Sequence, residues 1–340
     1  MKLTPMHRRD FNRLALAGSL AGVAYKRTDA SPETAGSVMV HSHIFIEHQD
    51  PMKTPEDIDP LRHYDYDSIL RAVRPKLEAV MALGCRRFLE CTSPWFGRAP
   101  ALMKRLAEDT GMEIWICTGL RGTAKHRYLP RYAFEESDRQ LADRWIREIR
   151  EGICGIRARF IKLGIDGGIN GAYEGRLAEI DQKLLRAAVI TTKETGVTIA
   201  CHTGDNSHAK VTYAEILTLL QREQMPLDRF VVVHAQHEDD FAWHEEIVRA
   251  GCWVEFDGIG RMVDWTVEAV ASLAGKGLLH RVLVSEDRPV CMATSVRAGV
   301  FPEQPNYRPY LRIYEEFLPK LQPDWRRQIM IENPIAAFGD

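Results

Sequence analysis

The stretch Val38-Met39-Val40-His41-Ser42-His43-Ile44-Phe45 decides the fold that we expect for this chain. Its apolar residues predict a short buried strand that carries two imidazoles, two positions apart. Because side chains alternate between the two faces of a strand, His41 and His43 should project to the same side near its carboxyl end. Two neutral imidazoles aimed at one point suit a divalent cation such as zinc. The pair becomes a convincing metal site only if other strands end with further ligands.

Seven more apolar runs predict strands, and each is followed by a helical pattern or a long excursion. Their Val and Ile residues are nearly continuous, which is typical of strands buried on both faces of a parallel sheet. Eight such units predict a (β/α)8 TIM barrel as one domain over residues 31–340. A doubly wound open sheet is the alternative, but its glycine-rich first turn would fall where His-Ser-His stands. The seven runs are residues 85–92, 113–118, 159–164, 197–203, 229–234, 252–257 and 281–287.

Residues 1–30 are expected to lie outside this domain. Arg8-Arg9-Asp10-Phe11 precedes a mildly apolar run and a small-residue exit at Ala30, which resembles a twin-arginine export signal. A short amphipathic or disordered tail is the alternative. We therefore expect a periplasmic protein from which this segment is removed. The segment holds six Lys or Arg and two Asp, so its removal takes the formal net charge from −2 to −6.

The composition also limits the partners. An acidic mature chain argues against a nucleic-acid partner, and no run is apolar for long enough to span a membrane. The seven cysteines sit mostly inside or beside apolar strand-like runs, without CxxC spacing. We therefore expect buried free thiols rather than disulfides. The oligomeric state is open, with a homodimer as one form that the chain could take.

The last residues of the predicted strands supply four histidines, one lysine and one aspartate. In a barrel the carboxyl ends of all strands meet at one mouth, where the catalytic residues of such enzymes lie. Each residue alone has an ordinary reading, such as a buried histidine bonded to a carbonyl group. Six at the same depth of one cavity instead indicate a metal site. These residues are His41, His43, Lys162, His202, His234 and Asp287.

Lys162 would be a poor metal ligand as an ammonium, because that group has no lone pair. Carbon dioxide added to its neutral amine would give a carbamate whose two oxygens can bridge two cations. With a carbamylated lysine beside the four histidines and the aspartate, the chain resembles the amidohydrolase superfamily, and within it the phosphotriesterase-related family. The resemblance covers nearly the whole chain after the predicted export signal. It rests on His41-Ser-His43, Phe160-Ile-Lys162, Ile199-Ala-Cys-His202-Thr, Val233-His234 and Leu283-Val-Ser-Glu-Asp287.

By that similarity the site holds two divalent cations, with zinc expected. The resemblance implies that His41, His43 and Asp287 bind the more buried ion, that His202 and His234 bind the more exposed one, and that carbamylated Lys162 bridges them. Two cations roughly 3.5–4 Å apart lower the pKa of a bridging water, so a hydroxide would attack while Asp287 takes the proton. The predicted reaction is hydrolysis of an ester, lactone or phosphoester bond in a small molecule. The alternatives are hydrolysis of a C–N bond, or a binding barrel with vestigial metals.

The chain departs from that family at three places. Ser42 stands where family members usually carry a glutamate, and we expect its side chain to face away from the metals. After His234 the family commonly places an acid as a proton relay, and here His237 or Asp239 could serve, or no relay exists. His237 as a ligand in place of His234 is the less favoured alternative.

The third departure concerns the substrate. Arg121 lies at the exit of the third predicted strand, after Leu120, and Arg288 directly follows Asp287 of the eighth; two arginines at a barrel mouth favour an anionic substrate group. A carbonyl substrate that bears a carboxylate is then at least as well supported as a neutral phosphotriester. Trp95, after the second strand, is a further candidate substrate contact. The alternative is that both arginines pair with surface carboxylates such as Glu135 or Glu303.

Overall fold

The computed structural model describes residues 30–51, 66–166, 176–204, 208–292 and 309–340. The expected export signal therefore lies outside the described residues, apart from Ala30. The described strands form one parallel sheet in the order β8-β7-β6-β5-β4-β3-β2-β1-β9. The strands are β1 (Ser37–Ile46), β2 (Cys85–Glu90), β3 (Glu113–Thr118), β4 (Ala158–Ile165), β5 (Ile199–Thr203), β6 (Phe230–Val233), β7 (Trp253–Phe256), β8 (Val282–Val284) and β9 (Pro289–Met292).

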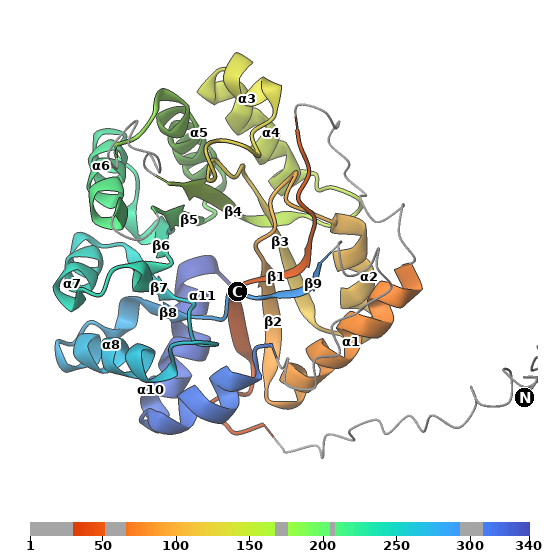
Figure 1. Ribbon diagram of the computed structural model, residues 1–340, viewed down its shortest axis with the longest axis vertical. Helices are drawn as coiled ribbons and strands as arrows, with labels where there is room; N and C mark the ends of the chain where they lie inside the picture. Colours follow the sequence, from red (N-terminus) through yellow and green to blue (C-terminus); the bar gives the residue numbers. More distant parts are fainter. Residues whose placement is uncertain (1–29, 52–65, 167–175, 205–207, 293–308) are drawn as a thin grey trace, which may run out of the picture.

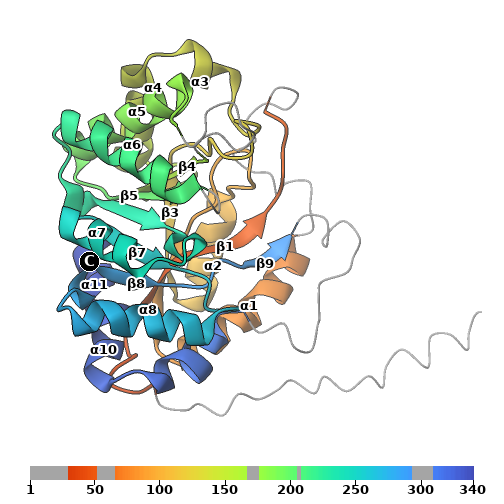
Figure 2. The ribbon, with the colours of Figure 1, turned by 60° about the vertical axis from the view of Figure 1, so that its left-hand side comes forward.

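Helices follow the strands and cover the outside of the curled sheet (Figure 1). Helices α6, α7 and α8 lie one after another along one side of it (Figure 2). The α-helices are α1 (Tyr66–Ala82), α2 (Pro100–Thr110), α3 (Arg131–Glu135), α4 (Asp138–Arg150), α5 (Glu179–Thr195), α6 (Ala209–Arg222), α7 (Phe241–Ala250), α8 (Val263–Gly275), α10 (Pro323–Arg327) and α11 (Asn333–Phe338). Short 3-10 or π turns occupy Leu227–Arg229, Ala235–His237, Leu279–Arg281, Ile313–Phe317, Leu318–Lys320 and Gln328–Glu332. The expected (β/α)8 TIM barrel is confirmed.

Helix α4 shows how local sequence sets one of these elements. The Ser137 side chain accepts a hydrogen bond from the Gln140 backbone N–H, and the Gln140 side chain accepts one from the Ser137 N–H. This reciprocal cap satisfies two donors that have no partner within the helix. Its apolar face, with Leu141, Trp145 and Ile146, is buried against the sheet and helix α5.

The strands are buried on both faces because the sheet encloses one core and carries another on its outside. The outer core joins residues such as Met39, Phe88 and Ile161 to the helices. The inner core fills the lumen and includes Phe160, whose ring lies 5.8 Å from that of Phe338 in α11. This explains why the strand sequences are nearly continuous in apolar residues. The seven cysteines are free thiols, as expected, and all but Cys154 are buried.

The barrel closes along a seam between its first and last strands. The run predicted as the eighth strand, residues 281–287, contains β8. A further strand that was not predicted, β9, follows this run, and β8 and β9 stand at the two ends of the sheet order. Strand β9 pairs with His43–Ile46 of β1. Between β8 and β9, the Ser285 hydroxyl accepts a hydrogen bond from the His41 N–H at 3.0 Å and donates one to the His41 carbonyl oxygen. None of the described helices is long and apolar enough to cross a bilayer.

Candidate metal centre

A cavity of about 510 Å³ opens at the carboxyl ends of the strands. All six residues singled out from the strand ends contribute to its wall. The structure therefore brings together groups that lie up to 246 residues apart in the sequence, as the barrel topology predicts. The residues are His41, His43, Lys162, His202, His234 and Asp287.

The alternation of side chains along the strands places three of these groups. Phe160 and Ala200 point into the lumen core, and two positions later Lys162 and His202 point to the same side, above that core. Asp287 lies in the break between β8 and β9, four positions after the lumen residue Leu283. Lys162, His202 and Asp287 thus continue the lumen-facing series of their own strands.

Strand β1 does not follow simple alternation. Val38 and Val40 belong to the lumen core, so strict alternation would turn His41 and His43 to the outer face with Met39. The pairing with β2 shifts register between Met39 and Ser42, which adds one residue to β1. Such a bulge re-aims the side chains that follow it. Both histidines consequently face the cavity, in the body of the strand rather than at its end.

His234 also depends on a local backbone device. It follows β6 directly and has a φ of 62°, in the left-handed region that a residue with a side chain seldom adopts. Holding this conformation costs on the order of 1–3 kcal/mol, and such residues concentrate at functional sites. The reversal of the chain keeps the ring at the cavity, where it lies 4.5 Å from the ring of His202.

Three of the six groups form a compact cluster with their ligand atoms together. Asp287 Oδ1 lies 3.2 Å from His43 Nε2 and 3.9 Å from His41 Nε2. The other oxygen, Oδ2, lies 4.0 Å from His234 Nε2. The donor atoms of His41, His43 and Asp287 lie within 4.8 Å of one another, close enough to bind one cation.

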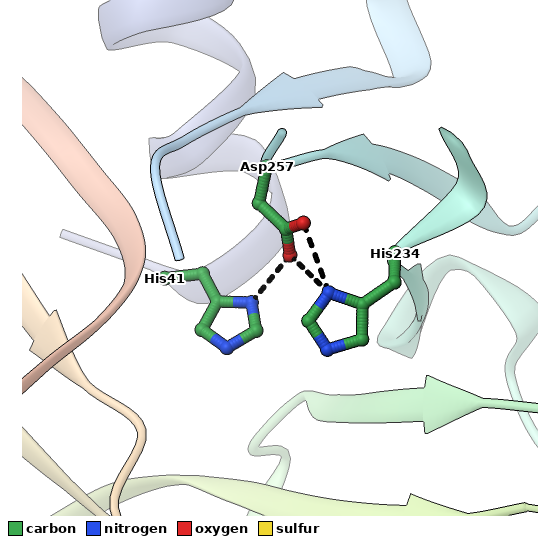
Figure 3. A group of neighbouring side chains, drawn as sticks. All are labelled: His41, His234 and Asp257. Carbon is green, nitrogen blue, oxygen red and sulfur yellow. Dashed lines mark hydrogen bonds and ion pairs between the residues drawn. The ribbon is translucent and has the colours of Figure 1, made fainter. Parts of the chain in front are cut away.

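Asp257 lies behind two of these histidines and was not identified from the sequence. Its carboxylate oxygens lie 2.8 Å from His41 Nδ1 and 2.7 Å and 2.9 Å from His234 Nδ1 (Figure 3). By distance alone the three residues could also hold an ion. The atoms that meet there are already at hydrogen-bond distance, however, which leaves no room for a cation. We therefore read Asp257 as the group that orients both rings, with their Nε2 atoms toward the cavity.

The two histidines of β1 have further buried partners. Glu255 Oε1 lies 2.9 Å from His41 Nδ1. His43 Nδ1 lies 2.8 Å from the Thr92 hydroxyl, which in turn donates to the Glu90 carboxylate. Hydrogen bonds at Nδ1 fix the tautomer and rotation of a ring that binds metal through Nε2.

Three of the atoms that should bind the metals make no hydrogen bond within the described protein. His41 Nε2, His202 Nε2 and Lys162 Nζ are buried, and none has a hydrogen-bond partner among the described residues. A buried polar group without a partner costs free energy, and a buried lysine amine costs more. Imidazole nitrogens with a carboxylate are donors that zinc accepts, and a carbamate would turn the lysine into an oxygen donor. The residues present therefore fit a metal centre.

The electrostatics of the metal-free site are uneven. Burial opposes protonation of His41, but the surrounding carboxylates, Glu255 first, outweigh it and raise its pKa to about 9. Burial lowers the pKa of His43 to about 4, against the attraction of Asp287. Burial, reinforced by the neighbouring His234, holds the pKa of His202 well below its usual range. At neutral pH two of the ligands are thus ready to bind a cation, whereas His41 must first lose a proton.

The candidate substrate contact Trp95 lies elsewhere. It has a φ of 57°, and its buried ring lies 5.9 Å from the ring of Tyr132 in α3. The next residue, Phe96, lines the cavity instead. The turn at Trp95 sends the two successive aromatic side chains in different directions, which a sequence pattern does not reveal.

Both predicted arginines line the cavity, together with a third, Arg261. Of the carboxylates proposed as their alternative partners, Glu135 forms an ion pair with Arg131 on its own helix. Glu303 lies outside the described residues. Arg288 instead has Nε 3.4 Å from Glu286 Oε1, within the cavity wall.

The two candidates for a proton relay, His237 and Asp239, lie in different places relative to the cavity. His237 lines the cavity, and its ring stacks on that of His234 with centroids 5.2 Å apart. Asp239 accepts a hydrogen bond from the Trp265 indole at 2.8 Å and is not among the residues of the cavity wall. Ser42 faces away from the metal ligands, as expected, with its hydroxyl 2.8 Å from the carbonyl oxygen of Arg288.

Several known proteins resemble this chain in sequence. A sequence model described as the Phosphotriesterase family matches residues 24–337. The phosphotriesterase homology protein of Escherichia coli (strain K12) is 29% identical over 216 residues, which cover 62% of this chain and 70% of that protein. The aryldialkylphosphatase of Saccharolobus solfataricus is 25% identical over 280 residues, which cover 80% of this chain and 79% of that protein.

Two further likenesses are informative. The N-acetyltaurine hydrolase of Homo sapiens is 29% identical over 231 residues, which cover 64% of this chain and 63% of that protein. A crystal structure of the phosphotriesterase homology protein from Escherichia coli, complexed with phosphate in the active site, superposes with a TM-score of 0.70. That superposition covers 90% of this chain and 99% of the other at 23% sequence identity, so it supports the fold.

Proposed function

The chain belongs to the phosphotriesterase family, and we propose that it is a binuclear metal-dependent hydrolase of small-molecule esters or lactones. In this proposal His41, His43 and Asp287 hold one cation, and His202 and His234 hold the other. Lys162, as its carbamate, joins the two. Zinc is the proposed metal, because the donors are mainly imidazole nitrogens.

One observation carries the proposal. Lys162 Nζ is buried in the cavity wall without a hydrogen-bond partner among the described residues, and the same wall holds the Nε2 atoms of His41 and His202, which also make no hydrogen bond to a described residue. An ammonium left in this position would be costly. A carbamate that binds cations would remove this cost. No group in the described part of the cavity wall accepts a hydrogen bond from Lys162 Nζ.

The residues of this chain then divide the chemistry. Two bound cations would lower the pKa of a water and polarise the substrate oxygen. Asp287 is placed to take the proton from that water, because its carboxylate faces three histidines at the centre of the site. Asp257 holds two of these rings in place. Phe96, Ile46 and Met262 give the outer cavity an apolar side for the rest of the substrate.

Hydrolysis of a C–N bond at the same site is the second candidate. It is favoured by the likeness to N-acetyltaurine hydrolase, whose name denotes an amide substrate. Both candidates need the same metals and the same attacking water. They differ in the leaving group, since an amine must be protonated as it departs. His237, which stacks on His234 at the cavity wall, is the residue best placed to serve an amine in that way.

A metal analysis and a substrate screen test the proposal. The zinc-loaded protein should contain two metal equivalents per chain by elemental analysis. It should then be assayed against lactones, aryl esters, phosphotriesters and N-acyl amino acids. Turnover of lactones or esters supports the main proposal, and turnover of N-acyl compounds alone supports the second. A protein that holds fewer than two equivalents and hydrolyses none of the four would be a vestigial barrel.

A further inference from the structure

We propose that Arg121, Arg261 and Arg288 form an anion-binding subsite in the outer wall of the cavity. The substrate would then carry a permanent negative charge that lies away from the bond to be cleaved. All three side chains line the same cavity as the candidate metal ligands. The inference rests on the proposed function for its substrate, but the subsite itself can be tested by binding alone.

Arg121 is held in place by two aromatic rings and a hydroxyl group. Its guanidinium carbon lies 4.0 Å from the centre of the Phe96 ring and 5.4 Å from that of Tyr128, and its Nε donates to the Thr123 hydroxyl. Its backbone bridges to Gly164 of β4. A Cβ at Gly164 would lie 2.6 Å from Thr123 Cγ2 and 3.2 Å from Arg121 Cγ, so the missing side chain makes room for this arrangement.

Arg288 is anchored through its backbone and its side chain. Its carbonyl oxygen accepts hydrogen bonds from Ser42 at 2.8 Å and from Tyr310 at 2.9 Å. Its Nε lies 3.4 Å from Glu286 Oε1. A Cβ at Gly260 would lie 2.2 Å from that oxygen and 3.0 Å from Arg288 Nε, so this glycine also makes room for an arginine.

The charge in the cavity wall is unevenly distributed. Asp257 and Asp287 lie against histidines at the inner end, where cations would bind. The outer wall carries three arginines, and of the lining carboxylates only Glu286 lies beside one of them. Arg261 is exposed and forms no ion pair with a described residue, so its positive charge is not neutralised within that part of the chain. The outer wall therefore attracts an anion.

The geometry also limits the kind of anion. An arginine held by aromatic stacking loses little side-chain freedom when it binds, and its planar fork matches the two oxygens of a carboxylate, sulfonate or phosphate. In this inference the group bound by the arginines is a different group from the one attacked at the candidate metal ligands. The proposed substrate is therefore an ester, lactone or amide with a second, anionic end.

A matched pair of lactones tests this directly on the zinc-loaded full chain. One carries a carboxylate, 5-oxotetrahydrofuran-2-carboxylate, and the other the isosteric neutral carboxamide. The expected result is a kcat/KM at least about tenfold higher for the carboxylate, because a charge-assisted contact is worth about that factor or more. Arg121→Gln and Arg288→Gln should each lower this ratio about tenfold, mainly through KM. Arg127→Gln, an exposed arginine on the same loop as Arg121, should leave it unchanged.

A binding experiment separates this inference from the proposed function. The keto acid 5-oxohexanoate cannot be hydrolysed, and heptane-2,6-dione is its neutral analogue. Calorimetry should show tighter binding of the keto acid, with the difference lost in Arg121→Gln. That result without turnover of any substrate would refute the hydrolase and keep the subsite. Turnover with equal kcat/KM for the two lactones would overturn the subsite and keep the hydrolase. Keto-acid binding that survives in both arginine variants would place the carboxylate on the metals and also overturn the subsite.

Discussion

The substitution Asp257→Asn should weaken both metal positions at once. The carboxylate of Asp257 is the only group in the described part of the chain that lies at hydrogen-bond distance from the Nδ1 atoms of both His41 and His234. These two rings belong to different ions in the proposed centre. An asparagine keeps the size of the side chain but can accept at only one atom, so at least one ring loses its orientation and both lose the negative charge.

The magnitude follows from the number of ligands affected. Removing a hydrogen-bond partner behind one metal-binding histidine typically costs about 10- to 100-fold in affinity, or about 1.4–2.8 kcal/mol. Because Asp257 serves one ligand of each ion, we expect a loss of that size in both binding steps. Glu255→Gln is the matched control, because Glu255 contacts His41 alone among the metal ligands. It should weaken only one step.

The assay is a zinc titration of the metal-free protein against a chromophoric chelator, which resolves the two binding steps. Circular dichroism and thermal unfolding of the metal-free variants establish that each one is folded. Two dissociation constants within threefold of the wild-type values in Asp257→Asn would refute the orienting role. A loss confined to one step would show that the carboxylate serves a single ring.

Three further predictions concern the bridge, the pH dependence and export. Lys162→Ala should lose activity and one or both metals, and acetate or propionate should restore part of the activity by replacing the carbamate; full activity without them would exclude a bridging role. Because the pKa of His41 is raised to about 9 in the metal-free protein, zinc must displace its proton below that pH, so affinity should rise about tenfold per pH unit from pH 7 and level off near pH 9. Calorimetry in buffers of different ionisation enthalpy should detect one released proton, and a flat profile contradicts the argument. Replacing Arg8 and Arg9 together with lysine should leave the precursor in the cytoplasm, and normal periplasmic recovery on fractionation would identify residues 1–30 as a tail.

The barrel was predictable because its signal is repeated. Eight apolar runs of strand length, each followed by a helix, leave few other topologies, and the structure confirms that arrangement. The candidate ligands could be identified for the same reason, since all of them follow or end a predicted strand. That rule also contained a signal that was not used. Trp253 and Glu255 of β7 and Asp257 directly after it occupy alternate positions, and acids at two successive positions of this lumen-facing series indicate a buried polar site rather than a strand exit.

What the sequence pattern could not supply was local backbone geometry. The bulge that turns His41 and His43 into the cavity depends on the register between β1 and β2, which involves residues about 50 positions apart. The turn at Trp95 places the side chain of Phe96, and not that of Trp95, at the cavity wall. The break between β8 and β9 reflects the pairing of Pro289–Met292 with the far end of β1. Each depends on contacts between residues that are distant in the chain. Residue propensities and hydrophobic periodicity do not contain that information.

A cation bound by His41, His43 and Asp287 would also stabilise the closure of the barrel between its first and last strands. His41 and His43 stand on β1, next to the edge strand β9, and Asp287 follows the opposite edge strand β8, so an ion bound by all three would join the two ends of the sheet. The contact it reinforces, Ser285 with His41, joins residues 244 positions apart. An ion that binds the folded chain and not the unfolded one would stabilise this closure without a covalent link, in a protein whose cysteines are all free thiols. Stripping the metals should therefore loosen the barrel first at this closure, and the backbone amides of β1 and β9 should be the first in the sheet to exchange with deuterium.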